Sequence, residues 1–329
     1  MIKNNRSQGK EYILKMLKKN PGQFVSGQHL GKNLSLSRTS VWKYIKELTG
    51  DGYEIERQTK SGYKFLSEPD LIIPYEIEEN NDALFIGKKV YYFKFAASTN
   101  EIAHELAGNN ASSGTIVISE VQNKGKGRQG RLWISNKGGL WFSLILRPDF
   151  SPLHASKITI IMAISVINAI KELFGINIAI KWPNDLFFIN KKIGGILIEM
   201  NAEIDKINYL VIGIGLNINN IIASDIKKTA VNLKSIVNKK IDRNYLLNKI
   251  LGEIEKNLNI FKKDDFSYFI DEAKKLCMNL GKRLKVTVGS DSITGECLDL
   301  DENGNLLLKE TSGNIRHIIS GDIEFLRDE

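Results

Sequence analysis

The sequence predicts a multidomain α/β (α+β) protein, with an N-terminal winged helix-turn-helix, a central mixed sheet packed with helices, and a C-terminal SH3-like β-barrel. Three observations lead to this fold class. The excess positive charge lies in the first fifth of the chain, apolar strands alternate with helices through the middle, and short strands with Gly turns fill the end. We place the domains at 1–66, 83–280 and 281–329, and interpret the acidic, Pro-containing residues 67–82 as a linker.

Length and composition exclude several classes of protein. The 329 residues are 42% hydrophobic and 26% charged, which is typical of soluble globular domains. The chain has no apolar run of the roughly 18 residues that span a bilayer, and its start lacks the apolar core of a signal peptide. We therefore expect a cytoplasmic protein with no membrane association. Cys277 and Cys297 have no His or Cys at metal-ligand spacing, so we expect no disulfide framework, zinc site or thiol nucleophile.

The N-terminal domain is predicted from its charge and helix signals. Residues 1–66 hold 13 Lys and Arg against 5 Asp and Glu, while the rest of the chain is neutral. Helices are expected over 11–18, over 24–34 with Ser26 at the start, and from the N-cap Ser37 to the glycine turn after Leu48. Two short strands around the basic turn 58–61 form a hairpin wing. A basic helix-turn-helix with a wing favours DNA binding, and a protein-docking module is the alternative.

The third helix would place its outer face in the major groove, with the wing beside it. The residues predicted to contact DNA are Arg38, Thr39, Trp42, Lys43, Lys46 and, in the wing turn, Lys60.

The loop over 122–133 is the most informative stretch of the central domain, because its glycines alternate with cations and an indole follows. Glycine lets a backbone approach a ligand closely, and Lys126, Arg128 and Arg131 supply positive charge, so the loop is suited to wrapping an anion. Arg131-Leu132 stand where a Walker A motif needs Lys and Ser/Thr, which excludes a P-loop. A solvated basic loop is the alternative.

Polar residues follow the first predicted strand of the central domain, over 89–95. Ser98 and Glu101 fit a capping box at the start of a helix. The functional alternative is that Ser98, Thr99 and Asn100 bind a small polar ligand at this strand-to-helix corner.

A second group follows a long apolar helix, which we predict to start at Ser151-Pro152 and to end near Phe174. The next buried strand delivers Lys181, whose charge is partly desolvated and needs either an anionic ligand or a structural partner such as Asp185. Glycine-bearing central strands are predicted over 192–199 and 209–219; the latter is not a dinucleotide fingerprint, because Ile218 replaces the third glycine.

The end of the chain is predicted to hold two Asp-capped helices and a small barrel. The helices cover 242–261 and 265–278. The barrel strands follow, separated by Gly turns, over 284–288, 293–298, 305–309 and 315–319.

Together these motifs resemble the family of bifunctional biotin protein ligases and biotin operon repressors over nearly the whole chain. Five motifs occur in the family's order: Ser98-Thr99-Asn100, the loop from Gly125 to Arg131 that ends at Trp133, Lys181 to Asp185, Gly194 to Glu199, and Gly213-x-Gly215-x-Asn217. Each motif is weak alone, and the ordered set is specific. The resemblance implies a class II synthetase-like catalytic domain between the DNA-binding and SH3-like domains.

The same resemblance implies the activity. Biotin and ATP, with Mg²⁺ carried by the ATP and no resident metal, would form biotinyl-5′-AMP, and a lysine of biotin carboxyl carrier protein would then accept the biotin. The adenylate would also act as corepressor, because the family binds its operator DNA as a homodimer that forms once the adenylate is bound. No enzyme nucleophile is needed for this chemistry, which agrees with the absence of Cys-His or Ser-His-Asp patterns.

The resemblance also assigns roles to residues. Lys181 and Arg128 would be catalytic, through their charge on the carboxylate and the α-phosphate. The predicted biotin-binding residues are Ser98, Thr99, Asn100, Gln122, Lys126, Gly127, Arg128 and Lys181. Those predicted to bind ATP or the adenylate are Arg131, Trp133, Asn184 and Asn217. The glycines expected to shape the loops are Gly125, Gly130, Gly194 and Gly195.

One departure from the family pattern and three alternatives stay open. The family's loop usually has Arg where this chain has Lys126, which keeps the charge and loses the planar guanidinium. The alternatives are a lipoate or octanoate transfer enzyme of related fold, a transcription factor that senses biotin without ligating it, and a ligase whose N-terminal domain no longer represses.

Overall fold

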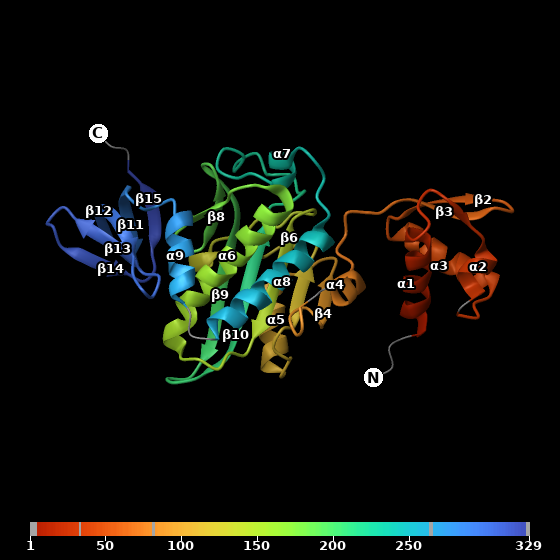
Figure 1. The fold of residues 1–329 in the computed structure, drawn as a ribbon, viewed down its shortest axis with the longest axis horizontal. Coiled ribbons are helices and arrows are strands. Elements are labelled where there is room, and N and C mark those ends of the chain that lie inside the picture. The colour runs from red at the N-terminus through yellow and green to blue at the C-terminus, as the bar shows by residue number, and fades with distance from the viewer. Residues whose placement is uncertain (1–4, 33, 81–82, 263–265, 327–329) are drawn as a thin grey trace. The chain divides into compact units, whose positions relative to one another are not determined.

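The computed structural model describes residues 5–32, 34–80, 83–262 and 266–326, and it divides after Leu71 into two compact units (Figure 1). Within the described residues, no helix is both long enough and apolar enough to cross a membrane. Each unit has its own core, so the two are described separately.

The first unit is a winged helix-turn-helix, as predicted. Its elements are α1 (Asn5–Lys18), β1 (Phe24–Val25), α2 (Gly27–Lys32), α3 (Arg38–Gly50), β2 (Glu54–Gln58) and β3 (Gly62–Ser67). Ser37 caps α3, because its hydroxyl accepts the Ser40 N–H at 3.1 Å. The predicted helix over 24–34 is shorter than expected, since Phe24 and Val25 pair with β3 as a strand. Val41, Ile45 and Leu48 bury the inner face of α3.

The predicted linker over 67–82 is wrong in its second half. Residues Pro74–Asn80 form helix α4, and Ile72 and Ile77 are buried in the core of the second unit. The backbone N–H of Ile73 donates to Asn244 Oδ1 at 2.8 Å. The acidic composition suggested a solvated segment, but the apolar residues at 72 and 77 pack against the central domain. Residues 81 and 82 lie outside the described residues.

The central domain is built on a mixed sheet with the strand order β4-β5-β6-β10-β9-β8-β7. Its strands are β4 (Val90–Phe93), β5 (Ile116–Ser119), β6 (Leu140–Leu146), β7 (Ala179–Lys181), β8 (Asp185–Phe188), β9 (Lys191–Ala202) and β10 (Ile207–Leu216). β4 and β5 are parallel, and the other neighbours are antiparallel. The two glycine-bearing strands predicted to be central, β9 and β10, are adjacent inside the sheet.

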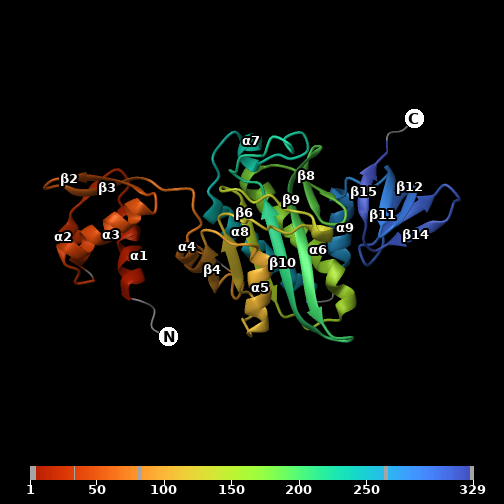
Figure 2. The same ribbon diagram turned by 180° about the vertical axis from the view of Figure 1, so that it is seen from behind.

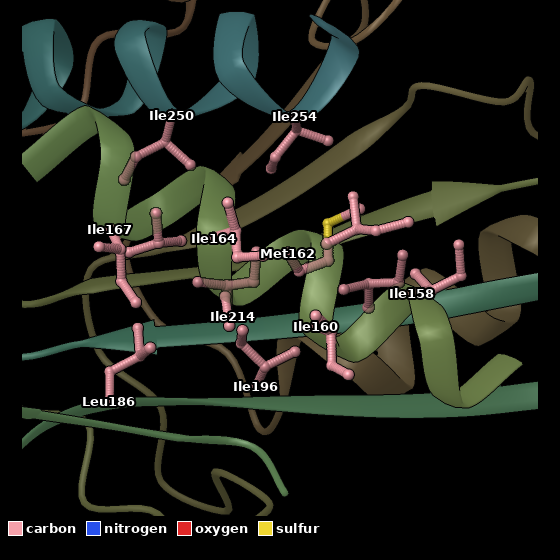
Figure 3. Packing of buried hydrophobic residues seen from close by; sticks show 14 of the residues in the cluster. Ile158, Ile160, Met162, Ile164, Ile167, Leu186, Ile196, Ile214, Ile250 and Ile254 are labelled. Atoms are coloured by element: carbon pink, nitrogen blue, oxygen red, sulfur yellow. The ribbon is translucent and has the colours of Figure 1, made fainter. Parts of the chain in front are cut away.

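Helices cover the two faces of this sheet unequally. α6 (Ala155–Phe174) and α8 (Arg243–Phe261) lie over one face, and α5 (Thr99–Gly108) lies over the other (Figures 1 and 2). Figure 3 shows the apolar layer on the first face, where isoleucines of α6 lie between Ile196 and Ile214 of the sheet and Ile250 and Ile254 of α8. Such a continuous apolar layer holds the sheet rigid. Polar residues lie at the start of α5, on the other face of the sheet, and the site described below is on that face.

Two predicted helix starts are corrected by the structure. Ser98 is the N-cap of α5 by position, but its side chain makes no capping bond, and Glu101 pairs with Lys126. The predicted capping box is therefore absent. Residues Pro152–His154 form a 3₁₀ turn, so α6 begins at Ala155, four residues after Ser151. Its end at Phe174 is as predicted, with Gly175 in the left-handed conformation that closes a helix.

The C-terminal domain packs in the second unit as a β-sheet with the order β14-β13-β12-β11-β15. Its strands are β11 (Arg283–Val288), β12 (Asp291–Leu300), β13 (Leu306–Glu310), β14 (Ile315–Ile318) and β15 (Asp322–Phe325), preceded by α7 (Leu233–Val237) and α9 (Ser267–Leu276). β15 was not predicted. Asp242 caps α8 as expected, whereas the predicted cap Asp265 lies outside the described residues.

Candidate active site

A cavity of about 810 Å³ lies in the second unit, where the α5 face of the sheet meets the glycine–cation loop over 122–133 and the strand β15. It collects predicted residues from segments far apart in the chain. Those that line it are Ser98, Thr99, Asn100, Gln122, Lys126, Gly127, Arg128, Arg131, Trp133, Lys181, Asn184, Gly195 and Asn217. A cavity of this size, with apolar walls and a few convergent polar groups, suits a small-molecule site.

One group of the side chains that line the cavity is polar and carries no charge. Gln122 accepts the backbone N–H of Thr99 at 2.7 Å through Oε1, and its Nε2 donates to Ser135 Oγ at 2.8 Å. Ser98, Thr99 and Asn100 are all buried, at 1%, 3% and 4% exposure. Buried polar groups are costly unless they are hydrogen-bonded, so this group is built to meet a neutral ligand with donors and acceptors.

Two glycines of β10 clear the floor of the cavity. A Cβ atom at Gly213 would lie 2.3 Å from Asn100 Oδ1, and one at Gly215 would lie 2.6 Å from Trp133 Nε1. A side chain at either glycine would project from the α5 face of the sheet and would displace the Asn100 amide or the Trp133 indole. The glycines noted in the sequence are therefore needed for close approach.

The glycine–cation loop is held by its own backbone. Gly127 N donates to Arg131 O at 2.7 Å, and Gln129 and Gly130 take positive φ angles of 54° and 73°. A Cβ atom at Gly125 would lie 2.4 Å from Trp133 O. Of the predicted loop glycines, Gly195 lines the cavity, and Gly125, Gly130 and Gly194 do not.

Another group of the lining side chains is cationic. Lys181 ends β7, half-buried, with its Nζ 5.1 Å from the ring centre of Phe325 and 5.6 Å from that of Phe187. Burial lowers the pKa of Lys181, and the charge of Asp185 partly opposes this. Asp185, the structural partner considered from the sequence, instead pairs with Lys192 at 2.7 Å. This arrangement favours a ligand anion as the partner of Lys181.

Arg128 and Arg131 hold the loop against the C-terminal domain. Arg128 donates to Asn184 Oδ1 at 3.1 Å and to Ser320 Oγ at 2.6 Å, while Arg131 pairs with Asp322. Burial lowers the pKa of the Arg128 guanidinium. Both arginines still line the cavity, so their charge reaches a bound ligand.

Trp133 and Asn217 border the cavity from the loop and from the end of β10. The Trp133 indole lies under Lys192, whose Nζ is 4.9 Å from the ring centre. Among the described residues, the indole Nε1 has no hydrogen-bond partner although it is buried. Asn217 is fixed by Asn220, which donates to its Oδ1 at 2.9 Å. A buried donor without a partner is available to a ligand acceptor.

Several cavity or supporting residues were missed by the sequence analysis. Lys192 was seen as the start of a strand, and Asp322 and Phe325 lie on the strand that was not predicted. Ser143 of β6 and Glu199 of β9, the two strands that flank β10, hydrogen-bond to Asn100, and the sequence analysis assigned neither of them a role. No local pattern marks these residues, since they meet the site through sheet register and domain packing.

Lys126, the departure from the family loop, is largely exposed. Its Nζ lies 2.9 Å from Glu101 Oε1, in the first turn of α5. The hydrogen bond that Lys126 donates to the Glu101 carboxylate raises the pKa of Lys126. The side chain therefore joins the loop to α5.

In the first unit, all six residues predicted to bind DNA are exposed to solvent. The five on α3 point away from the buried face, and Lys46 Nζ lies 5.4 Å from the Trp42 ring centre. Lys60 stands in the wing turn with a φ of 71°. Cations on an exposed helix face, with a basic wing, suit a nucleic-acid backbone.

The described parts of the chain hold no group of three or more His, Cys, Asp or Glu arranged for a metal ion. Burial also raises the pKa of Cys297 to about 12, so this cysteine is a neutral thiol at physiological pH.

Comparison with known families covers most of the chain. Residues 92–217 match the biotin/lipoate A/B protein ligase family, residues 10–64 match an HTH domain, and residues 280–326 match the biotin protein ligase C-terminal domain.

Individual relatives extend this match over nearly the whole chain. The chain is 36% identical to the bifunctional ligase/repressor BirA of Bacillus subtilis, over 97% of this chain and 99% of that protein. It is 28% identical to the protein of the same name in Escherichia coli, over 92% and 93%. Among solved structures, the biotin protein ligase from Aquifex aeolicus in complex with biotin and ATP superposes with a TM-score of 0.65 and 35% identity, over 73% of this chain and 100% of that one.

Proposed function

The chain belongs to the biotin/lipoate A/B protein ligase family, in its group of bifunctional ligase/repressors, and on this basis we propose that it ligates biotin to protein and represses transcription. The membership confirms the resemblance found in the sequence. The proposed reaction joins biotin and ATP to biotinyl-5′-AMP and then transfers biotin to a lysine of biotin carboxyl carrier protein. Such a protein acts in the cytoplasm, where ATP, carrier protein and DNA are present.

The observation that carries this proposal is the cavity with its neutral polar group and its cationic group. The neutral polar groups of Thr99 and Gln122 fit the ureido ring of biotin. The cation at Lys181 fits the biotin carboxylate. The remaining volume, between Trp133 and Asn217, would hold ATP. A ligand with a neutral ring and an anionic tail therefore matches the distribution of charge.

The residues suit an adenylation without an enzyme nucleophile. The biotin carboxylate attacks the α-phosphate, pyrophosphate leaves, and the acyl adenylate remains. Two anions approach each other in this step, so Lys181 and Arg128 would offset the repulsion at the reacting atoms. Mg²⁺ would enter with ATP as the counter-ion of its phosphates. The carrier lysine then attacks the acyl carbon, and AMP leaves with the bonding electrons.

Pyrophosphate release with biotin and Mg·ATP tests the ligase. Lys181→Ala is expected to lower the rate at least about 100-fold, because a buried cation at the reacting anions is lost. Lys191→Ala is a matched control, since Lys191 is exposed on the same sheet and does not line the cavity. Addition of a carrier domain should then give a biotinylated lysine. Release with lipoate or octanoate instead of biotin would assign a related transfer enzyme, and no release with any acid would assign a sensor.

The repressor role rests on the winged helix-turn-helix, with the adenylate as corepressor and a homodimer as the DNA-binding form. Lys43→Ala and Lys60→Ala should each weaken binding to DNA upstream of biotin genes and lower the salt dependence by about one ion, if each contacts a phosphate. Lys19→Ala is the control, because Lys19 is exposed outside α3 and the wing. Sedimentation with and without biotinyl-5′-AMP tests the dimer. A ligase that binds no such DNA with the adenylate present would retain the enzyme and exclude the repressor.

A further inference from the structure

Behind the neutral polar group of the cavity lining, four side chains form one hydrogen-bonded chain. Glu199 Oε2 lies 2.6 Å from Asn100 Nδ2, and Asn100 Oδ1 lies 2.6 Å from Ser143 Oγ. Ser143 Oγ is in turn 2.7 Å from Thr99 Oγ1. Asn100, Ser143 and Thr99 are almost fully buried, so protein partners rather than water must satisfy them.

The direction of every bond in this chain follows from Glu199. An ionised carboxylate only accepts hydrogen bonds, so the amide nitrogen of Asn100 must face it and the amide oxygen must face Ser143. Ser143 has one hydroxyl hydrogen and must give it to that oxygen. The bond between Ser143 and Thr99 then has to be donated by Thr99. Thr99 Oγ1 is therefore left with lone pairs alone for the cavity.

The sheet is shaped to keep this arrangement. Gly213, on β10 between Ser143 of β6 and Leu197 of β9, leaves the space that Asn100 occupies. Glu199 stands on the same face of β9, two residues beyond Leu197, outside the cavity lining. Its Oε2 also lies 3.6 Å from His104 Nε2 on α5. Glu199 thus acts on the cavity through Asn100 and does not line it.

We propose that Glu199 is a positioning and specificity-determining residue, which makes Thr99 a hydrogen-bond acceptor for an N–H group of the ligand. This inference rests on the proposed function, in which that group belongs to the ureido ring of biotin. A fatty acyl or dithiolane end has no N–H to offer, and would leave the buried Thr99 oxygen without its ligand partner. A site built for a hydrogen bond discriminates strongly against ligands that lack it. The carboxylate on β9 therefore favours biotin over the acids used by the related transfer enzymes.

Replacement of the carboxylate separates direction from charge. Glu199→Ala frees the Asn100 amide to rotate, so the KM and Kd for biotin should rise about tenfold or more, while the KM for ATP changes little. Glu199→Gln can still accept from Asn100 through its amide oxygen, and should bind biotin within about threefold of the unmodified protein. His104→Ala is the control for the other contact of Glu199 and should leave biotin binding unchanged within about twofold.

A second pair of variants guards against loss of folding. Asn100→Asp places two carboxylates in contact and should abolish tight biotin binding. Addition of Glu199→Gln should restore it, since the new amide can donate to Asp and the other Asp oxygen can still accept from Ser143. Rescue of affinity by a second substitution is not expected of a generally unstable protein.

Isothermal titration with biotin on the full chain, together with both KM values, gives the readout. Rescue in the double variant and retention in Glu199→Gln would support the inference. If the unmodified protein binds biotin but Glu199→Ala binds it equally well, or Glu199→Gln loses as much as Glu199→Ala, the inference is overturned and the ligase assignment stands. If the unmodified protein does not bind biotin, the proposed function itself fails.

Discussion

Arg128 Nη2 lies 2.6 Å from Ser320 Oγ and donates a hydrogen bond to it, although 192 positions separate the two residues in the chain. This bond, with that of Arg131 to Asp322, joins the glycine–cation loop to the turn before β15 and to the first residue of that strand. The C-terminal domain thereby forms one wall of the cavity, and release of the loop should open that wall.

Arg128→Gly should therefore let biotinyl-5′-AMP escape before transfer. The substitution removes both the charge and the bonds to Asn184 and Ser320, and loss of a charged hydrogen bond of this kind raises an off-rate about tenfold or more. Biotin on the lysines of an unrelated bystander protein measures the escape. Ser320→Ala is the matched control, because it removes one bond and keeps the cation, and its escape should be smaller. Equal adenylate retention by the Arg128→Gly and unmodified proteins would contradict this role.

Gly213→Ala should weaken biotin binding about tenfold or more, because the new methyl group would lie 2.3 Å from Asn100 Oδ1 and the amide would have to move. Titration of biotin against the variant measures the loss. Gly252→Ala on α8 is the control, since its Cβ would meet open space. That change should leave biotin binding unaffected and stabilise the fold by about 0.5–1 kcal/mol. Unchanged affinity in Gly213→Ala would mean that Asn100 is not held as described.

Binding of the anionic substrate should weaken with rising pH earlier than an ordinary lysine would cause. Burial lowers the pKa of Lys181 below 10.5, so its positive charge is present below the lowered pKa and is lost above it. The KM for biotin should therefore rise at alkaline pH in the unmodified protein. Lys181→Arg keeps its charge throughout, so its KM should stay level over the same range, whatever its absolute activity. A similar rise in both proteins would assign the titration to another group.

Folding stability should depend strongly on the buried pair of Arg243 and Glu120. Their side chains are 1% and 4% exposed, and Arg243 also donates to Gly139 O at 2.7 Å. Arg243→Met leaves a buried carboxylate unpaired and should lower the free energy of unfolding by about 3–5 kcal/mol. Lys249→Met, which breaks the exposed pair with Glu172, should cost no more than about 1 kcal/mol. Urea unfolding of both variants checks the difference, and similar losses would contradict it.

Lys126→Arg, which restores the family's usual residue, should change adenylate dissociation by less than about threefold, because the side chain serves here as an exposed partner of Glu101. Glu101→Gln should have a similarly small effect, and high salt should reduce it further. Adenylate dissociation at two salt concentrations measures both. A large gain with Arg would show that the planar guanidinium acts on the ligand itself.

Much of the fold could be predicted because its signals are local. Ser37 and Asp242 cap helices as expected, since a capping side chain bonds to a backbone only two or three residues away. The strands β9 and β10 were recognised from apolar runs with glycines. The second half of the linker was misinterpreted because α4 has an acidic surface, and its few apolar residues become informative only once α8 lies beside them.

The candidate site, like the fold, was predictable only in its local features. The chemical groups available to the site could be recognised in the amino-acid sequence: the loop of glycines and cations, the polar corner at Ser98, and a lysine at a strand end. The pairing of these groups depends on the folded chain: Asp185 binds Lys192, which leaves Lys181 for a ligand, and Glu199 hydrogen-bonds to Asn100. The reason is that ion pairs and hydrogen bonds act over a few ångströms in space, and sheet register and domain packing set those distances without any periodic trace in the chain.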